Sequence, residues 1–188
     1  MCTSCRFLST LTGVAVLTIF FVLSGCATTG GDNVTSSYEE QRDRTVYETQ
    51  PVRITKRGSG LGMSGQQVIY VKARADCQGA SCEPDAVNLI LASGTRNVSW
   101  INYDDVHVRA DEWSQTFHNV SRREDPELVG VGEFLRLTIG LDDYRSMLRT
   151  QSLNIQVGGT DINLSFNQLE RFRELAAVAT GEHEEIRG

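Results

Sequence analysis

Apolar residues recur at every second position along much of this chain, and this period constrains the fold more than any other feature of the sequence. Val52 and Ile54, for example, alternate with the polar residues Arg53 and Thr55. The same alternation runs through residues 68–73, 87–91, 98–100, 106–108 and 134–139. A period of two is typical of strands that bury one face. Turn-forming residues separate closely spaced runs, which favours hairpins over crossover helices, and we therefore predict a mainly antiparallel sheet.

Two helices are predicted toward the C-terminus. Leu141, Tyr144 and Leu148 fall at positions i, i+3 and i+7, which places them on one helical face. Ser165 and Gln168 have the spacing of a capping box, which marks the start of the second helix. Its apolar face consists of Leu169, Phe172, Leu175 and Ala176.

The segment between the two helices is predicted to be a hairpin. Two alternating runs, 152–157 and 160–166, flank Gly158-Gly159, and a two-residue glycine link between such runs is a strong hairpin signal. Strands, a helix, a hairpin and a second helix therefore follow one another. This order predicts an α+β domain over residues 45–180, with the two C-terminal helices packed on one face of the sheet.

The first 25 residues have the layout of a secretory signal peptide. Arg6 is the only charged residue before Asp32, and residues 7–22 are apolar apart from one serine and three threonines. As a helix this stretch would measure about 24 Å, which is short for a bilayer core of about 30 Å. Small residues follow it, as they do before the cleavage site of a signal peptide.

The tetrapeptide Leu23-Ser24-Gly25-Cys26 that closes this segment resembles the lipobox of bacterial lipoproteins, in which an aliphatic and two small residues precede an invariant cysteine. The resemblance covers this segment alone. It implies that Cys26 is diacylated on its thiol, becomes the first residue after cleavage, and is usually acylated on its new amine too. Two or more acyl chains hold a protein stably on a membrane. An ordinary cleaved signal peptide and an uncleaved membrane anchor are the alternatives.

The residue after Cys26 bears on localisation. In Gram-negative lipoproteins an aspartate at this position commonly retains the protein in the inner membrane, and this chain has Ala27 instead. The resemblance therefore implies a cell-envelope protein that binds membrane lipid through acylated Cys26, in the periplasmic leaflet of the outer membrane. The inner membrane is the alternative.

Polar segments flank the predicted domain on both sides. Residues 26–44 contain little apolar surface, so they cannot bury enough of it to fold alone. We therefore predict a flexible tether between Cys26 and the domain. Residues 181–188 are predicted to form a mobile acidic tail.

The five cysteines suggest redox or metal chemistry until they are divided by position. Cys2 and Cys5 lie in the predicted signal peptide and Cys26 is the predicted lipidation site, which leaves Cys77 and Cys82. Because the compartment beyond the inner membrane is oxidising, we predict a structural disulfide between these two. The alternatives are a redox pair, which usually has the spacing Cys-x-x-Cys, a zinc site, which needs two more ligands, and free thiols.

The candidate for a reactive site is formed by His107, His118, Asp104 and Asp105. The two histidines flank a predicted hairpin that turns near residues 111–112, so they can be neighbours across strands with an aspartate close by. Two histidines and a carboxylate are able to bind a metal or to perform acid–base chemistry. The alternative is a pair of surface histidines, because a register shift of one residue moves a side chain to the other face.

Four aromatic residues lie in the same region of the sequence: Trp100, Tyr103, Trp113 and Phe117. Aromatic residues at strand spacing usually belong to a core, and we predict a core role here. An exposed aromatic strip that binds a ligand is the alternative.

The sequence contains no signature of a serine hydrolase or of a His-Glu-x-x-His zinc enzyme. The Gly-rich match to a dinucleotide pattern at residues 60–65 is followed by a strand pattern where a helix is required, so no cofactor and no metal are predicted. The formal net charge of −6 argues against nucleic acid as a partner.

Together these observations predict a lipid-anchored, non-enzymatic binding or structural module for an envelope protein or the cell wall. The first alternative is a small hydrolase facing the periplasm that uses the histidines and aspartates named above. The second is a ligand-binding lipoprotein, which requires a sizeable apolar cavity.

Overall fold

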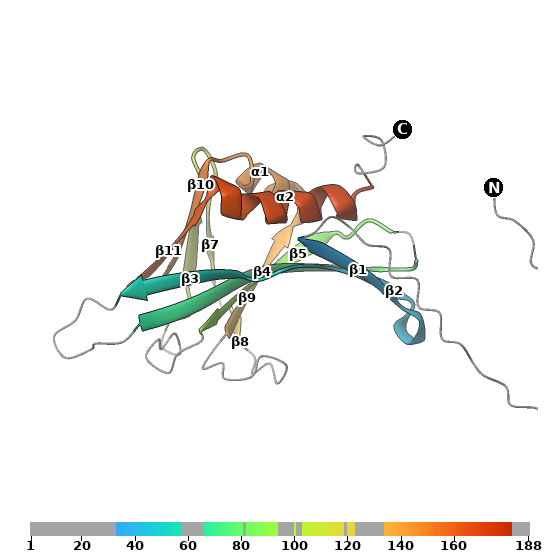
Figure 1. The fold of residues 1–188 in the computed structure, drawn as a ribbon, viewed down its shortest axis with the longest axis horizontal. Helices are drawn as coiled ribbons and strands as arrows, with labels where there is room; N and C mark the ends of the chain where they lie inside the picture. Colours follow the sequence, from blue (N-terminus) through green and yellow to red (C-terminus); the bar gives the residue numbers. More distant parts are fainter. Residues whose placement is uncertain are drawn as a thin grey trace, which may run out of the picture.

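The computed structural model describes residues 33–57, 66–80, 82–93, 100, 103–118, 120–122 and 134–181. These residues form an α+β fold with two antiparallel sheets and two α-helices, which confirms the predicted fold class (Figure 1). The signal peptide, Cys26, the Gly-rich match at 60–65 and the tail after Gly181 lie outside the described residues.

The larger sheet contains seven strands in the order β1-β2-β4-β5-β9-β8, with β3 paired to β4. Their bounds are β1 Val34–Glu39, β2 Arg44–Thr49, β3 Val52–Arg57, β4 Gln66–Gln78, β5 Ala86–Ser93, β8 Ser121–Arg122 and β9 Phe134–Gly140. The long strand β4 pairs with β2 through residues 74–78 and with β3 through residues 66–71, so one strand supports both N-terminal elements.

The smaller sheet contains four strands in the order β11-β10-β6-β7. Their bounds are β6 Val106–Arg109, β7 Ser114–Phe117, β10 Ser152–Val157 and β11 Thr160–Ser165. The predicted hairpin around Gly158-Gly159 is confirmed as the β10–β11 connection. The strand pairing of β10 with β6 joins this hairpin to a second one, β6–β7.

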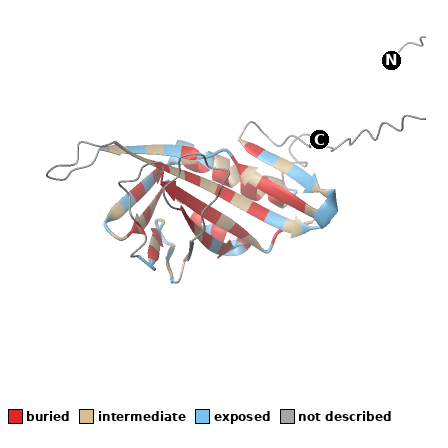
Figure 2. Cartoon of the chain, turned by 90° about the horizontal axis from the view of Figure 1, so that it is seen from below, coloured by how far each residue is buried: buried red, intermediate tan, exposed pale blue. Residues whose placement is uncertain are grey.

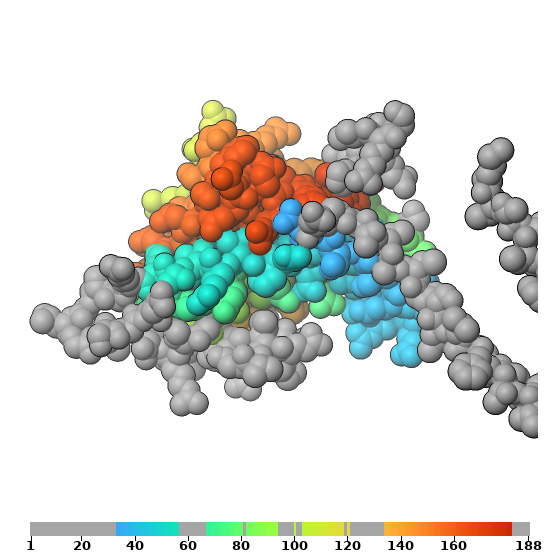
Figure 3. Space-filling model, in the orientation of Figure 1, coloured from blue at the N-terminus to red at the C-terminus, as the bar shows by residue number. Residues whose placement is uncertain are grey.

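Both helices lie on the same face of the larger sheet, as predicted (Figure 1). Helix α1 spans Leu141–Met147 and helix α2 spans Phe166–Ala179, and the predicted capping box of Ser165 and Gln168 is present. Helix α2 contacts β1, β2 and β4 of the larger sheet as well as β10 and β11 of the smaller one. Figure 3 shows this C-terminal segment, coloured red, packed against the blue and teal N-terminal strands.

One hydrophobic core joins the two sheets and the helices. Leu89 and Leu137 from the larger sheet, Val108 and Ile155 from the smaller sheet, and Phe172 from α2 all belong to it. Figure 2 shows buried positions alternating with less buried ones along the strands, which is the pattern that the period of two predicted. A small second cluster, Ile90, Ala92 and Phe134, lies on the opposite face of the larger sheet.

The predicted tether boundary at residue 44 is wrong, because residues 34–39 form strand β1. Val34 is buried in the main core and pairs with Thr49, while Thr35 and Ser37 are exposed and account for the polar composition. An edge strand needs few apolar residues, because its backbone hydrogen bonds to β2 do not depend on side chains. A one-turn 3-10 helix, Glu40–Arg42, links β1 to β2.

The strand predicted at 98–100 is not observed at its described residue. Trp100 is buried, with 1% of its surface exposed, but it belongs to no strand. Its partner in the alternation, Val98, lies outside the described residues. Trp100 is therefore a core residue that a non-strand segment supplies.

Candidate functional site

The register of the β6–β7 hairpin determines on which face of the smaller sheet His107 and His118 lie. Its register pairs His107 with Thr116 and Val106 with Phe117. Val106 and Val108 face the core, so the side chain of His107 lies on the solvent side of the smaller sheet. Continuing the register by one step places Asp105 opposite His118, on that same side. The two histidines therefore lie on the same face of the hairpin, but His107 is paired with Thr116 and not with His118.

Each histidine has its own partner. Nδ1 of His107 lies 2.8 Å from the Thr116 hydroxyl oxygen, and Nδ1 of His118 lies 2.8 Å from Oδ1 of Asp105. The second pair is open to solvent, because the side chain of His118 is 67% exposed and that of Asp105 is 52% exposed. The predicted proximity of a histidine to an aspartate is thus observed for Asp105.

These contacts do not form a nucleophilic relay. A serine-protease-like triad requires one imidazole that bonds a hydroxyl on one side and a carboxylate on the other. Here the Thr116 hydroxyl and the Asp105 carboxylate are bound to different imidazoles. Within the described part of the chain, no group of three or more His, Cys, Asp or Glu side chains is arranged to hold a metal ion.

A polar cleft of about 400 Å³ lies at this end of the smaller sheet. Its walls are Tyr103, Asp104, Asp105, His107, Gln156 and Gly158. Strand pairing explains the assembly, because His107 on β6 lies directly opposite Gln156 on β10. The cleft contains three of the four residues proposed from sequence, and His118 borders it through its contact with Asp105.

The aromatic wall of the cleft is Tyr103, which rests on the β10–β11 turn. A Cβ atom at position 158 would fall on the Tyr103 ring, almost equally close to Cζ, Cε1 and Cε2, so one ring face lies against Gly158. Gly158 also has φ +54°, a left-handed conformation that glycine adopts without strain. Position 158 therefore requires glycine for two reasons: its backbone is left-handed, and a side chain there would collide with the Tyr103 ring.

Tyr103 is the exception among the four aromatic residues predicted to be core. Trp100 is buried, and Trp113 and Phe117 are partly buried against the core, whereas Tyr103 is 43% exposed. Sequence reasoning did not identify Gln156 or Gly158 as cleft residues. The available signal was the glycine pair at the hairpin turn, but the neighbour of that turn was not readable from the sequence.

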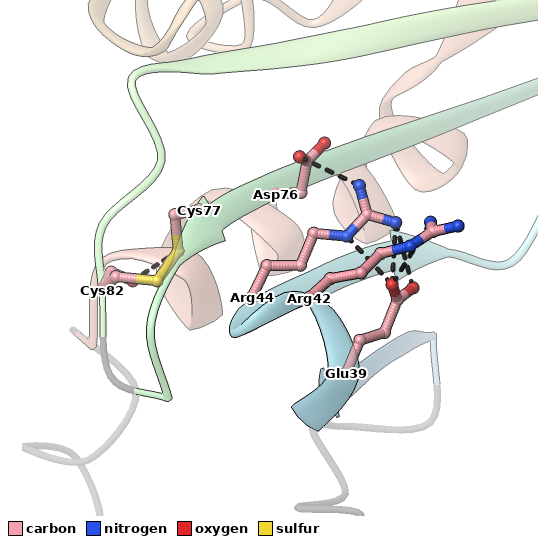
Figure 4. A network of polar contacts seen from close by, with 6 residues as sticks. All are labelled: Glu39, Arg42, Arg44, Asp76, Cys77 and Cys82. Carbon is pink, nitrogen blue, oxygen red and sulfur yellow. Dashed lines mark hydrogen bonds and ion pairs between the residues drawn. A yellow bond between two sulfur atoms is a disulfide. The ribbon is translucent and has the colours of Figure 1, made fainter.

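The predicted disulfide between Cys77 and Cys82 is present, with Cα atoms 5.9 Å apart (Figure 4). It closes the β4–β5 connection beside the β1–β2 hairpin. The Tyr47 hydroxyl donates to the carbonyl oxygen of Cys82 at 3.5 Å, and the Thr45 hydroxyl donates to that of Gly79 at 2.7 Å. The disulfide loop and the hairpin are therefore attached to each other directly.

An ion-pair network secures the same region (Figure 4). The Arg44 guanidinium donates to both carboxylate oxygens of Glu39 and lies 3.6 Å from Oδ2 of Asp76. Nearby, a 2.7 Å hydrogen bond from the Tyr38 hydroxyl lowers the pKa of Asp43 and raises the pKa of Tyr38. These contacts join β1 to β2 within the N-terminal hairpin and join the hairpin to β4.

Comparison of the whole chain with protein-family models, with curated proteins and with solved structures finds no match. Among the described residues, no helix is long and apolar enough to cross a membrane. The N-terminal motif, the disulfide and the cleft are the features of this chain that bear on function.

Proposed function

We propose that this protein is a lipid-anchored lipoprotein of the bacterial cell envelope and acts there as a non-enzymatic binding module. The observation that carries the proposal is the tetrapeptide Leu23-Ser24-Gly25-Cys26 at the end of a short apolar run. Cys26 is the acylated residue, and the domain that begins near Asn33 faces the periplasm from the outer membrane.

The disulfide between Cys77 and Cys82 supports an exported protein, because such bonds persist in oxidising compartments and are rare in the cytosol. The bond also accounts for both cysteines that follow Cys26 in the chain. No cysteine is then left over for a zinc or redox centre.

The cleft favours binding over hydrolysis. Its carboxylates and imidazole offer several hydrogen-bonding groups, but the Thr116–His107 and Asp105–His118 contacts are separate pairs. A hydrolase that acts through an activated hydroxyl would need them joined. The cleft walls are polar, which also disfavours the alternative of a ligand-binding lipoprotein with a sizeable apolar cavity.

Lipid labelling tests the anchor. In a bacterial host fed radioactive palmitate, the wild-type chain is expected to incorporate label and to fractionate with membranes. Cys26→Ser removes the thiol that accepts the diacylglyceryl group, so both properties should be lost.

Cys5→Ser is the matched control, because it removes a thiol from the same N-terminal segment without touching the motif. It should retain full labelling. Undiminished label on Cys26→Ser would refute the lipoprotein assignment.

A further inference from the structure

We propose that the cleft at the end of the smaller sheet binds a carbohydrate chain through hydroxyl recognition and an aromatic platform on Tyr103. This inference rests on the proposed function as a binding module and names its ligand class. It uses three observations: an exposed ring held in a fixed place, a cleft that mixes donors with acceptors, and a polar face that continues from the cleft across the sheet.

The platform is the Tyr103 ring. One face of the ring lies against Gly158, and 43% of the surface of Tyr103 is exposed beside the cleft. A flat ring of this kind suits the C–H face of a sugar, which is weakly apolar and slightly positive and is attracted to the negative face of an aromatic ring.

The polar walls match the hydroxyl groups at a sugar's edge. Each hydroxyl both donates and accepts a hydrogen bond. The carboxylates of Asp104 and Asp105 accept, and the Gln156 amide does both. His107 adds a ring nitrogen, because within the described residues its only hydrogen bond, to Thr116, uses Nδ1 and leaves Nε2 for a ligand.

The same face extends beyond the cleft as rows of polar side chains. The strand register places Thr116, His107, Gln156 and Asp161 in one row across the four strands, and Ser114, Arg109, Asn154 and Asn163 in the next. The Asn154 amide donates to Oδ1 of Asn163 at 2.7 Å. Donors and acceptors are interspersed along these rows, which suits a chain of sugar units rather than an isolated small molecule.

Other ligand classes fit the cleft less well. Among the described residues that line it there is neither lysine nor arginine, so none of them neutralises a phosphate or a carboxylate. An organic cation would engage the two aspartates, but the neutral amide of Gln156 would have no role. A hydroxyl-rich ligand uses all of these groups.

A binding titration in solution tests the proposal. The chain from residue 26 onward, carrying Cys26→Ser, would be titrated with a chitin-type tetrasaccharide, with a cellulose-type tetrasaccharide and with N-acetyl-lysine methylamide. We expect at least one saccharide to bind with a dissociation constant of about 1 mM or tighter. Tyr103→Ala should weaken that binding about tenfold, Asp104→Asn should weaken it several-fold, and Tyr103→Phe should preserve it.

Tyr38→Ala is the matched control for the platform, since Tyr38 is similarly exposed at 38% but lies on β1 of the other sheet. Asp142→Asn, on a fully exposed side chain of α1, controls for the loss of one negative charge. Both should bind as the parent does. Circular dichroism of each variant verifies that it is folded.

Absence of binding to both saccharides at about 10 mM would overturn the proposal, as would binding to the lysine derivative alone, which would indicate a cation site. Equal weakening by Tyr38→Ala and Tyr103→Ala would overturn the location. Because the titration uses unacylated protein, a lack of saccharide binding would not contradict the proposed lipid anchor. A lack of palmitate labelling would likewise not contradict saccharide binding by the cleft.

Discussion

At the scale of single residues, Tyr144 makes stability sensitive to alkaline pH. Its side chain is fully buried, and its hydroxyl donates to the backbone carbonyl of Phe172 at 3.2 Å. Burial raises the pKa of Tyr144 well above its usual value near 10. Because the pKa is higher in the folded state, the neutral phenol stabilises the fold fully below about pH 10, and this contribution is lost as the pH rises further.

Tyr144→Phe is therefore expected to have opposite effects in two pH ranges. At pH 7 it should lower the free energy of unfolding by about 1 kcal/mol, because the hydrogen bond to Phe172 is lost. Above about pH 10 its stability should fall less steeply than that of the wild type. Urea unfolding at a series of pH values measures both, with the exposed Tyr103→Phe as control. Identical slopes for the wild type and Tyr144→Phe would contradict the assignment.

Tyr144 and Tyr103 show when the position of a single residue can be predicted from the sequence. Tyr144 was placed correctly, because helical spacing relates it to Leu141 and Leu148 within one local element. Tyr103 was misplaced, because its surroundings come from the β10–β11 turn, more than 50 residues away in the chain. Contact across two strands depends on register, and alternation alone does not specify register.

At the scale of elements, the β1–β2 hairpin is part of the domain, and truncation distinguishes it from a tether. A chain that starts at Asn33 retains the Asn33–Glu174 hydrogen bond and all of β1, so its melting temperature should stay within about 2 °C of the longer chain. A chain that starts at Arg44 loses the burial of Val34, six paired residues and the Glu39 carboxylate.

The second truncation should lose about 2–3 kcal/mol, which corresponds to a fall of roughly 5–10 °C in melting temperature. Thermal unfolding followed by far-ultraviolet circular dichroism gives the answer. Equal melting temperatures for the two truncated chains would show that β1 contributes nothing and that the boundary at residue 44 was right after all.

The elements found from sequence were those with a complete local pattern. The β10–β11 hairpin has alternation on both sides of two glycines, and α2 has a capping box followed by an apolar face. Strand β1 has a single buried apolar residue, Val34, so its composition resembles that of a linker. Its partner β2 and the helix α2 above it determine its conformation, and neither is encoded within the segment itself.

At the scale of the whole molecule, moving the domain boundary to Asn33 shortens the distance to the proposed anchor. Six residues lie between Cys26 and Asn33, and even a fully extended chain spans at most about 25 Å over these seven steps. A tether of the predicted length, ending at residue 44, would reach further. Under the proposed lipid anchor, the domain would be held close to the headgroups, and a partner would approach it at the membrane surface.

The shared core also determines how the molecule unfolds. Val108 and Ile155 of the smaller sheet pack in the same hydrophobic cluster as Leu89 and Leu137 of the larger one. Apart from the small cluster of Ile90, Ala92 and Phe134, the buried core of the described residues is shared by both sheets, so with the disulfide intact the two are expected to unfold in a single transition.

Trp113 provides a local probe for this prediction, because it is partly buried beside the β6–β7 hairpin of the smaller sheet. In a Trp100→Phe variant its fluorescence reports on that sheet, while far-ultraviolet circular dichroism reports on both sheets and the helices. The urea midpoints of the two signals should coincide, in this variant and in the wild type. An earlier midpoint for Trp113 would mean that the sheet carrying the cleft opens by itself, and the rigid polar face that a carbohydrate chain requires would then depend on the ligand for its order.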